Sequence, residues 1–258
     1  MKRITSPKNE FIRKLKRLHS ASQRRKQGMF PIVGKREVVR ALEAKFPITH
    51  ILSTNENPEI SEHLRKNLAN TELIWVSEHV MEELSYGETK PELLAIGKYV
   101  LPSPEDFDYS GRIVVLADIE KPGNIGAIMR VADATGSKVI IASEHIDPWN
   151  PNIIRASTGT IFSLPWVLLP PQEALRQLEK QGIPIVVATP EAEETYWDVD
   201  LKSPVAIVVG SEHLGVPQSW KDSADILVSI PMLGIADSLN TSASAALLLY
   251  ESLRQERV

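Results

Sequence analysis

The stretch RIVVLADIEKPGNIGAIMRVADATGSKVIIAS, residues 112–143, decides the fold class. It begins with the apolar run RIVVLAD and ends with the run KVIIAS, and both runs are typical of buried strands. Between them, NIGAIMRVADATG has the spacing of a helix, with Asn124 as the expected N-cap and Gly136 just past its end. A strand, a helix and a second strand in this order predict an α/β domain with a largely parallel sheet.

The same alternation of strands and helices continues toward the C-terminus. We expect a short helix at PNIIRAST, a longer one at PQEALRQLEKQG, strands at IPIVVATP, VAIVVG and ILVSIP, and a final helix within SLNTSASAALLLYESL. Upstream, VLPSPEDFDYSG at residues 100–111 is rich in Pro, Ser and acidic residues and shows no periodicity. We interpret it as a linker, so the predicted domains are residues 1–105 and 109–258.

The N-terminal part predicts a second, smaller α/β domain. One helix is expected over NEFIRKLKRLHSASQRRKQG, where Gly28 is a plausible stop. The elements expected after it are a helix at EVVRALEAKF, a strand at ITHILST, a helix at EISEHLRKNLAN, a strand at ELIWVS and a helix at EHVMEELS. Alternation of this kind again favours a largely parallel sheet.

Composition excludes several classes of protein. Hydrophobic residues make up 43% and charged residues 24% of the 258 residues, which is ordinary for a globular protein. No apolar run approaches the about 18 residues that a membrane span needs, and the N-terminus has no signal-peptide core. Cys is absent and the six His are scattered without a zinc motif, so we expect no disulfide and no metal. A reducing cytoplasm is the expected location.

Positive charge gathers at the N-terminus although the net charge is −4. Within the first 26 residues only Glu10 opposes the cations Lys2, Arg3, Lys8, Arg13, Lys14, Lys16, Arg17, Arg24, Arg25 and Lys26. Such asymmetry indicates an electrostatic partner, and a phosphate backbone is the usual one. A solvated helix face remains the alternative interpretation.

Nucleotide-cofactor motifs are missing. No two of the 13 glycines have the G-x-G spacing of a dinucleotide-binding loop, which argues against an oxidoreductase. Gly210 and Gly215 have P-loop spacing, but Val216 and Pro217 replace the Lys and Ser/Thr that grip phosphate and magnesium. The G-x-S-x-G elbow of the α/β-hydrolases is absent as well.

Three strands of the second domain are followed by loops of unusual composition, at residues 115–130, 208–217 and 228–242. Because ligands bind beyond the carboxyl ends of strands in open α/β sheets, these loops are expected to share one site. They offer mostly neutral polar groups, and only Arg130, Glu212 and Asp237 bring charge close to the expected site. Such a site suits a ligand with an adenine and an apolar or sulfonium-bearing tail, since a triphosphate would call for more cations.

The three loops resemble the signature motifs of the SpoU/TrmH family of RNA ribose 2'-O-methyltransferases in the SPOUT superfamily. The motifs are N-x-G-x-x-x-R from Asn124 to Arg130, G-S-E-x-x-G from Gly210 to Gly215, and I-P-M…S-L-N-x-S from Ile230 to Ser242. IIRASTGTIFSLP also looks like a family segment. FPIVGKREVVRAL is similar to the opening of the L30e-like substrate-binding domain of many members, although Val33 replaces an acidic residue. Near Leu93, KPELLAIGKY also lacks a glycine that members often have, and both departures leave the choice of RNA open.

This resemblance implies a fold, a cofactor and partners. The fold would be a SPOUT α/β domain with a deep trefoil knot, following a smaller L30e-like domain. The cofactor would be S-adenosylmethionine (AdoMet), lined by Thr189, Gly210, Ile230, Ser238 and Leu239. A homodimer would form through the C-terminal domain, without membrane or metal. The RNA partner would contact Arg13, Lys14, Arg17, Arg24, Arg25, Arg130 and Arg155.

The implied reaction is methyl transfer to a ribose 2'-hydroxyl, with catalytic candidates Arg130, Asn124, Glu212, Ser238 and Asn240. A guanidinium stays protonated and is a poor base, so we expect Arg130 to orient the target phosphate and help the hydroxyl lose its proton. Glu212 is expected to fix loop geometry or a partner arginine rather than to act as a base. Ribosomal RNA, 23S in particular, is the favoured substrate because of the additional N-terminal domain. A transfer RNA methyltransferase and a non-catalytic RNA-binding protein of the same fold are the alternatives.

Overall fold

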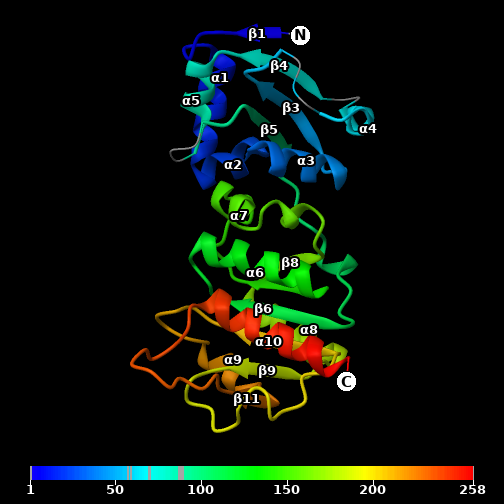
Figure 1. Ribbon diagram of the computed structural model, residues 1–258, viewed down its shortest axis with the longest axis vertical. Helices are drawn as coiled ribbons and strands as arrows, with labels where there is room; N and C mark the ends of the chain where they lie inside the picture. The colour runs from blue at the N-terminus through cyan, green and yellow to red at the C-terminus, as the bar shows by residue number, and fades with distance from the viewer. Residues whose placement is uncertain (1, 57, 59, 69–70, 87–89, 258) are drawn as a thin grey trace. The chain divides into compact units, whose positions relative to one another are not determined.

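The computed structural model describes residues 2–56, 58, 60–68, 71–86 and 90–257 and divides the chain into two compact units (Figure 1). The first unit contains Met1–Val100 and Asp147–Ser163, and the second contains Leu101–Ile146 and Leu164–Val258. Both units combine helices with a sheet, so the predicted α/β class is confirmed. None of the helices within the described residues has the length and apolarity needed to cross a membrane.

The sheet of the first unit has the strand order β1-β4-β3-β5-β2. Its strands are β1 (Lys2–Ile4), β2 (Met29–Val33), β3 (Ile48–Ser53), β4 (Glu72–Val76) and β5 (Leu93–Lys98). Strands β1, β4 and β3 run parallel, but β5 is antiparallel to both β3 and β2, so the expectation of a largely parallel sheet was wrong for this unit. The unpredicted strand β2 contains Pro31, which an edge strand can accommodate.

The helices of the first unit are shorter than expected. They are α1 (Glu10–Lys16), η1 (Arg17–His19), α2 (Ala21–Gln27), α3 (Lys35–Glu43), α4 (Glu62–Arg65), η2 (Lys66–Leu68) and α5 (Glu78–Leu84). The single helix predicted from residue 9 to 28 breaks at Ser20, whose backbone is extended, while Gly28 ends α2 in the left-handed region as expected. The helix predicted at residues 59–70 is represented by α4 and η2, and residues 59, 69 and 70 lie outside the described residues.

Segment 147–163 belongs to the first unit although it follows a strand of the second. It contains α7 (Pro151–Ala156) and η4 (Thr160–Phe162). Trp149 is buried and stacks on Phe30 with ring centroids 4.4 Å apart, and it also contacts Phe46 and Phe162. The contacts with Phe30 and Phe46 hold the segment to the domain that precedes it in the sequence.

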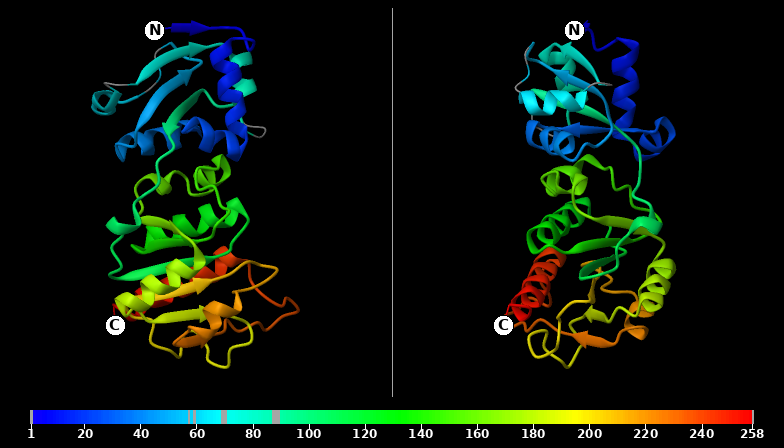
Figure 2. Two further views of the ribbon diagram at one scale, coloured as in Figure 1. Left: turned by 180° about the vertical axis from the view of Figure 1, so that it is seen from behind. Right: turned by 90° about the vertical axis from the view of Figure 1, so that its right-hand side faces the viewer.

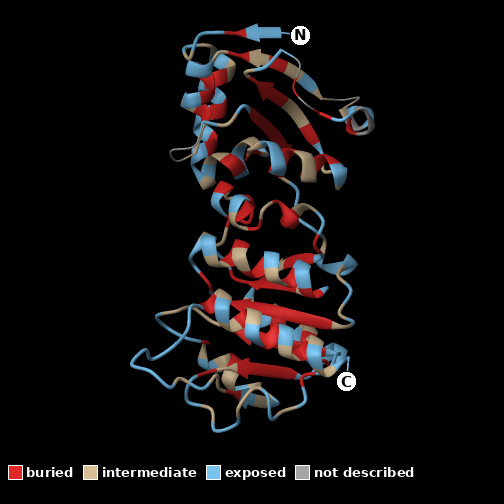
Figure 3. Cartoon of the chain, viewed as in Figure 1, coloured by how far each residue is buried: buried red, intermediate tan, exposed pale blue. Residues whose placement is uncertain are grey.

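The second unit is built on a six-stranded, fully parallel sheet with the order β11-β9-β10-β6-β7-β8. Its strands are β6 (Arg112–Ala117), β7 (Lys138–Ala142), β8 (Trp166–Leu169), β9 (Ile185–Ala188), β10 (Val205–Val209) and β11 (Ile226–Val228). Strand order reverses between β6 and β10, the kind of switch point at which α/β sheets bind ligands. Most of the strand residues are buried, as Figure 3 shows, because both faces of the sheet are covered.

Helices cover both faces of this sheet (Figure 2). They are α6 (Pro122–Thr135), α8 (Pro171–Gln181), α9 (Gln218–Asp222) and α10 (Thr241–Gln255), with η3 (Pro104–Asp106) before the sheet. Helices α8 and α9 pack on one face through a cluster that contains Leu178 and Trp220. Helices α6 and α10 lie side by side, with α10 against β6 and β10.

One helix start differs from expectation. Helix α6 begins at Pro122 with Lys121 as its N-cap, so Asn124 lies inside the first turn and is not the cap. Helix α10 begins at Thr241, inside the expected segment, and its cap is Asn240, whose side chain accepts a hydrogen bond from the Ser242 amide at 2.9 Å. Asn240 therefore caps its helix, whereas Asn124 does not.

The buried Arg112 fixes the end of α10. Its Nε donates to Ser252 Oγ at 2.6 Å, its Nη1 donates to the carbonyl of Thr135 at 3.0 Å, and its Nη2 lies 2.8 Å from Glu256 Oε2. One guanidinium at the start of β6 thus holds the last turns of both α6 and α10.

We predict that Arg112→Leu lowers the free energy of unfolding by about 3 kcal/mol, because it leaves buried acceptors unpaired. Chemical denaturation would measure the change. The control is Arg254→Leu, which removes an exposed pair with Glu251 and should cost less than about 0.5 kcal/mol. Equal effects of the two substitutions would contradict the role given to Arg112.

Candidate functional site

A cavity of about 280 Å³ lies at the carboxyl ends of β9, β10 and β11. Its lining comes from the ends of these strands, from the loops that follow them and from the first turn of α10. The cavity brings together all five residues predicted to line a cofactor, namely Thr189, Gly210, Ile230, Ser238 and Leu239. Sequence positions more than 40 residues apart thus meet at one edge of the parallel sheet.

Gly210 allows the loop after β10 to fold back on itself. A Cβ at this position would lie 2.2 Å from the carbonyl oxygen of Gly215, closer than real atoms approach. Ser211 and Gly215 exchange backbone hydrogen bonds of 3.1 and 2.9 Å, and Ser211 Oγ accepts from the Leu214 amide. The base of the loop is held by Thr241 Oγ1, which donates to the Gly210 carbonyl at 3.0 Å.

Glu212, in the same loop, is the acceptor at the centre of a polar cluster. Lys121 and Asn240 both donate to its carboxylate, and Asn240 Nδ2 also donates to Asn124 Oδ1 at 3.2 Å. Hydrogen bonds from Lys121, Asn124 and Asn240 lower the pKa of Glu212 below its ordinary value. The carboxylate is therefore held as an anion and is suited to fixing geometry rather than to accepting a proton.

Arg130 lies on α6 and is exposed. Among the described residues, no acidic side chain pairs with its guanidinium, which leaves it able to meet an anionic ligand. The Asn240 side chain, in contrast, already has hydrogen-bond partners: its Nδ2 donates to Glu212 and Asn124, and its Oδ1 accepts from Ser242. Asn240 is thus occupied within the protein, whereas Arg130 faces solvent.

The rim of the cavity contains charged residues that sequence reasoning missed. Thr189 is buried and donates from its hydroxyl to Glu191, and Lys221 Nζ lies 3.3 Å from the same carboxylate. Hydrogen bonding by Thr189 contributes most to lowering the pKa of Glu191. Neither Glu191 nor Lys221 belongs to a motif, so only the folded arrangement reveals them. Lys121 was not predicted as a site residue either, although a lysine close to the start of a predicted helix could have indicated it.

Several of the cations predicted to bind RNA are exposed in the first unit. Arg13, Lys14 and Arg17 line a groove of about 1000 Å³ between α1 and α2, together with Lys26. Arg25 is exposed and hydrogen-bonds Tyr99. Arg155 is exposed on α7, where its Nη2 donates to Asn152 at 3.0 Å.

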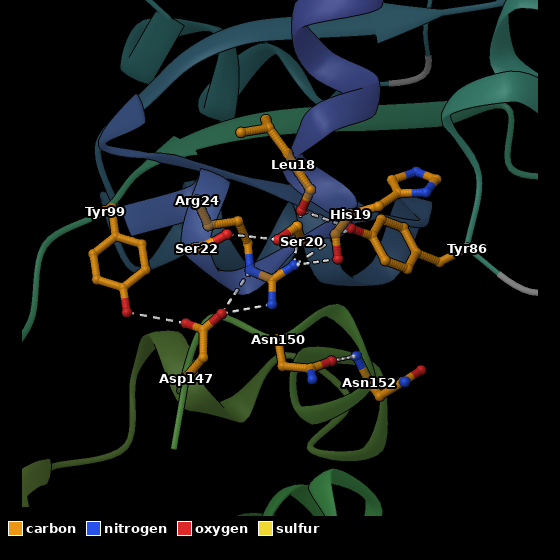
Figure 4. A network of polar contacts seen from close by, with 10 residues as sticks. All are labelled: Leu18, His19, Ser20, Ser22, Arg24, Tyr86, Tyr99, Asp147, Asn150 and Asn152. Carbon is orange, nitrogen blue, oxygen red and sulfur yellow. Dashed lines mark hydrogen bonds and ion pairs between the residues drawn. The ribbon is translucent and has the colours of Figure 1, made fainter. Parts of the chain in front are cut away.

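Arg24 corrects the prediction. Figure 4 shows its guanidinium directed at Asp147 and at the backbone of Leu18 and His19, and the residue is only 2% exposed. Its Nε donates to Asp147 at 2.7 Å, and its Nη1 donates to the carbonyls of Leu18 and His19. Tyr99 also donates to Asp147. A buried, fully engaged guanidinium cannot contact a phosphate backbone, so the expected RNA contact was wrong for this residue.

Comparison with known families agrees with the geometry. Residues 111–250 match the SpoU rRNA Methylase family, and residues 9–95 match the MRM3-like substrate binding domain. The first match covers more than half of the chain. The chain belongs to the SpoU rRNA Methylase family. The resemblance predicted from three motifs and from the opening of the first domain is therefore confirmed.

Several relatives of this SpoU chain align with nearly its whole length. The 23S rRNA (uridine(2479)-2'-O)-methyltransferase of Streptomyces viridochromogenes is 35% identical and aligns with 98% of this chain and 92% of its own length. A crystal structure of an RNA 2'-O ribose methyltransferase is 40% identical, covers 99% of this chain and 100% of its own, and has a TM-score of 0.86. The SpoU methyltransferase AviRb of S. viridochromogenes, solved with AdoMet, is 31% identical, with a TM-score of 0.83 and coverage of 97% and 99%.

We predict that Gly210→Ala weakens AdoMet binding by at least about tenfold, because relieving the clash with Gly215 must move the loop and costs on the order of 1–3 kcal/mol. Isothermal titration calorimetry would measure the dissociation constant. Gly123→Ala is the matched control, since a Cβ there meets nothing within 4 Å. An unchanged affinity for Gly210→Ala would show that the loop is not part of the cofactor site.

Proposed function

We propose that this SpoU protein transfers the methyl group of AdoMet to a ribose 2'-hydroxyl of ribosomal RNA, with 23S rRNA as the favoured substrate. The observation that supports this most is that two motif loops line one cavity, while Asn124 of the first motif, on the helix that carries the exposed Arg130, hydrogen-bonds Asn240 of the third. The 23S rRNA methyltransferases among its full-length relatives favour ribosomal over transfer RNA.

The residues of the cavity fit AdoMet. Gly210 lets the loop that lines the cavity fold back on Gly215, and Ile230, Met232 and Leu239 add apolar surface. Acidic side chains outnumber cations in the lining, which contains Glu191, Glu212 and Asp237 but one lysine, Lys221. That balance suits a cofactor that carries a sulfonium. We assign Thr189, Gly210, Ile230, Ser238 and Leu239 to cofactor binding, and bound AdoMet supplies an electrophilic methyl group.

Arg130 is the residue we assign to the chemistry. A 2'-hydroxyl is a weak nucleophile, and attack requires in-line positioning and charge stabilisation as the proton leaves. The Arg130 guanidinium is free to bind the target phosphate and to stabilise negative charge on the 2'-oxygen. Asn124, Glu212 and Asn240 bond one another, so we assign them to holding the loops, whereas Ser238 lines the cavity beside the cofactor.

We assign residues 1–105 to RNA binding and 109–258 to catalysis. In the first unit, Lys2, Arg3 and Lys16 pair with Glu72, Glu56 and Glu83. Arg13, Lys14 and Arg17 have no acidic partner among the described residues, and they share one groove. Unpaired cations gathered in this way favour a polyanion such as RNA.

Exposed apolar residues support a homodimer through the C-terminal domain. Leu233 and Ile235, beside the cavity, are fully exposed, and Leu247 and Tyr250 are 39% and 51% exposed on α10. Grouped exposure of this kind marks interaction surfaces. We also propose the deep trefoil knot of the SPOUT superfamily for the second unit, and a cytoplasmic location, which a ribosomal substrate and a cysteine-free chain both fit.

We predict that Arg130→Ala lowers kcat by at least about 100-fold while leaving AdoMet affinity unchanged, because the arginine acts on developing charge. Labelled methyl transfer to a 23S rRNA transcript would measure it. Arg176→Ala, which removes an exposed arginine of α8, should leave the rate unchanged. Methylation of transfer RNA alone would favour the first alternative, and AdoMet binding without any methyl transfer would favour the non-catalytic one.

We predict that replacing Arg13, Lys14 and Arg17 by Gln reduces the slope of log K against log salt by about two to three, since each phosphate contact contributes about 0.7–0.9. Fluorescence anisotropy with a 23S rRNA fragment between 50 and 200 mM salt, about the range over which such slopes are read, would measure it. The control replaces Lys2, Arg3 and Lys16, which are paired with acids. If the control lowered the slope equally, general charge rather than this groove would explain binding.

A further inference from the structure

The N-cap of α6 is an unfavourable residue for a helix start. Helices prefer Ser, Thr, Asp or Asn at this position, and the positive end of the helix dipole disfavours a cation. Lys121 occupies it and makes no capping hydrogen bond. Helix stability therefore gives no reason for a lysine here, and another contact must account for it.

That contact is the carboxylate of Glu212. Lys121 Nζ donates to Glu212 Oε2, while the lysine side chain is 58% and the glutamate 18% exposed. The donor comes from the start of α6, and the acceptor comes from the loop after β10 that lines the cavity. The same helix carries Arg130, so this ion pair connects the helix of the arginine to the loop of the cavity.

The loop has few other attachments. Within the described residues, its tip is tied to itself by the hydrogen bonds between Ser211 and Gly215. Its base is held by Thr241, and its Glu212 is held by the neutral donors Asn240 and Asn124 and by Lys121. Within the part of the chain that the structure describes, Lys121 is the one charged donor bonded to this loop. Charge-assisted hydrogen bonds are stronger and more directional than neutral ones.

We propose that Lys121 is a positioning residue that sets the place of the 210–216 loop relative to the helix bearing Arg130. It acts through Glu212 and touches no reacting atom. In this way it fixes the distance between the cofactor cavity and the arginine that faces the RNA. This role rests on the proposed function in one respect, namely that the proposed function identifies the cavity as the AdoMet site.

The decisive variant is Lys121→Ser, because serine improves the helix cap while removing the bond to Glu212. The melting temperature should be unchanged or higher. Hydrogen exchange of a peptide covering residues 210–216 should become faster in the protein without cofactor. The AdoMet dissociation constant should rise about fivefold, the size expected for a half-exposed ion pair. Lys121→Arg, which keeps the charge, should behave as wild type.

The double variant Lys121→Ser with Glu212→Gln tests whether Lys121 acts through Glu212. Its AdoMet affinity should match that of Glu212→Gln alone, since the two changes break the same bond. Additive losses would overturn the proposal, as would unchanged loop exchange in Lys121→Ser or a loss of affinity that merely follows a lower melting temperature. If wild-type protein bound no AdoMet, the proposed function would fail, yet the loop-exchange result would still decide the role of Lys121.

Discussion

The carboxylate of Glu212 is where three distant parts of the chain meet. It accepts hydrogen bonds from Lys121 before α6 and from Asn240 at the start of α10, and Asn240 reaches on to Asn124. Each of the three parts follows the carboxyl end of a strand in a parallel sheet, so the sheet delivers them to one edge. A buried or half-buried carboxylate is stable only when it accepts hydrogen bonds, and the residues that donate them hold the loops together.

Two further constraints keep this arrangement in place. Gly210 lets one loop close upon Gly215 with no side chain between them, and Arg112 holds the far ends of α6 and α10 from inside the unit. The first constraint acts at the cavity and the second at the opposite end of the same helices. Together they leave Arg130 as an exposed cation on a helix that is held at both ends.

Sequence patterns anticipated the second unit better than the first. The apolar runs of β6, β7, β9 and β10 stand out because strands buried on both faces are apolar throughout. Strand β1 of the first unit has only three residues and β2 contains Pro31, and only pairing with distant strands makes them recognisable.

The five cofactor candidates came from the family resemblance, four of them from its motifs, and they do share one cavity. Contacts between residues far apart in the chain could not be predicted from the sequence. Nothing local says that Arg24 bonds Asp147, 123 residues away, or that Lys121 meets Glu212, 91 residues away. Side-chain charge is visible in a sequence, but whether it is free or neutralised depends on the tertiary structure. This is why a cluster of cations had to be sorted by the structure into paired and unpaired members.

Segment 147–163 has a consequence for the independence of the two units. It is encoded between β7 and β8 of the second unit's sheet, yet Trp149 and Asp147 are buried against Phe30 and Arg24 of the first unit. A fragment cut at the linker would leave these aromatic rings and this carboxylate without their partners. The two units therefore cannot be exchanged between relatives as separate modules at that linker, and a chimaera would have to transplant this insertion together with the domain it packs on.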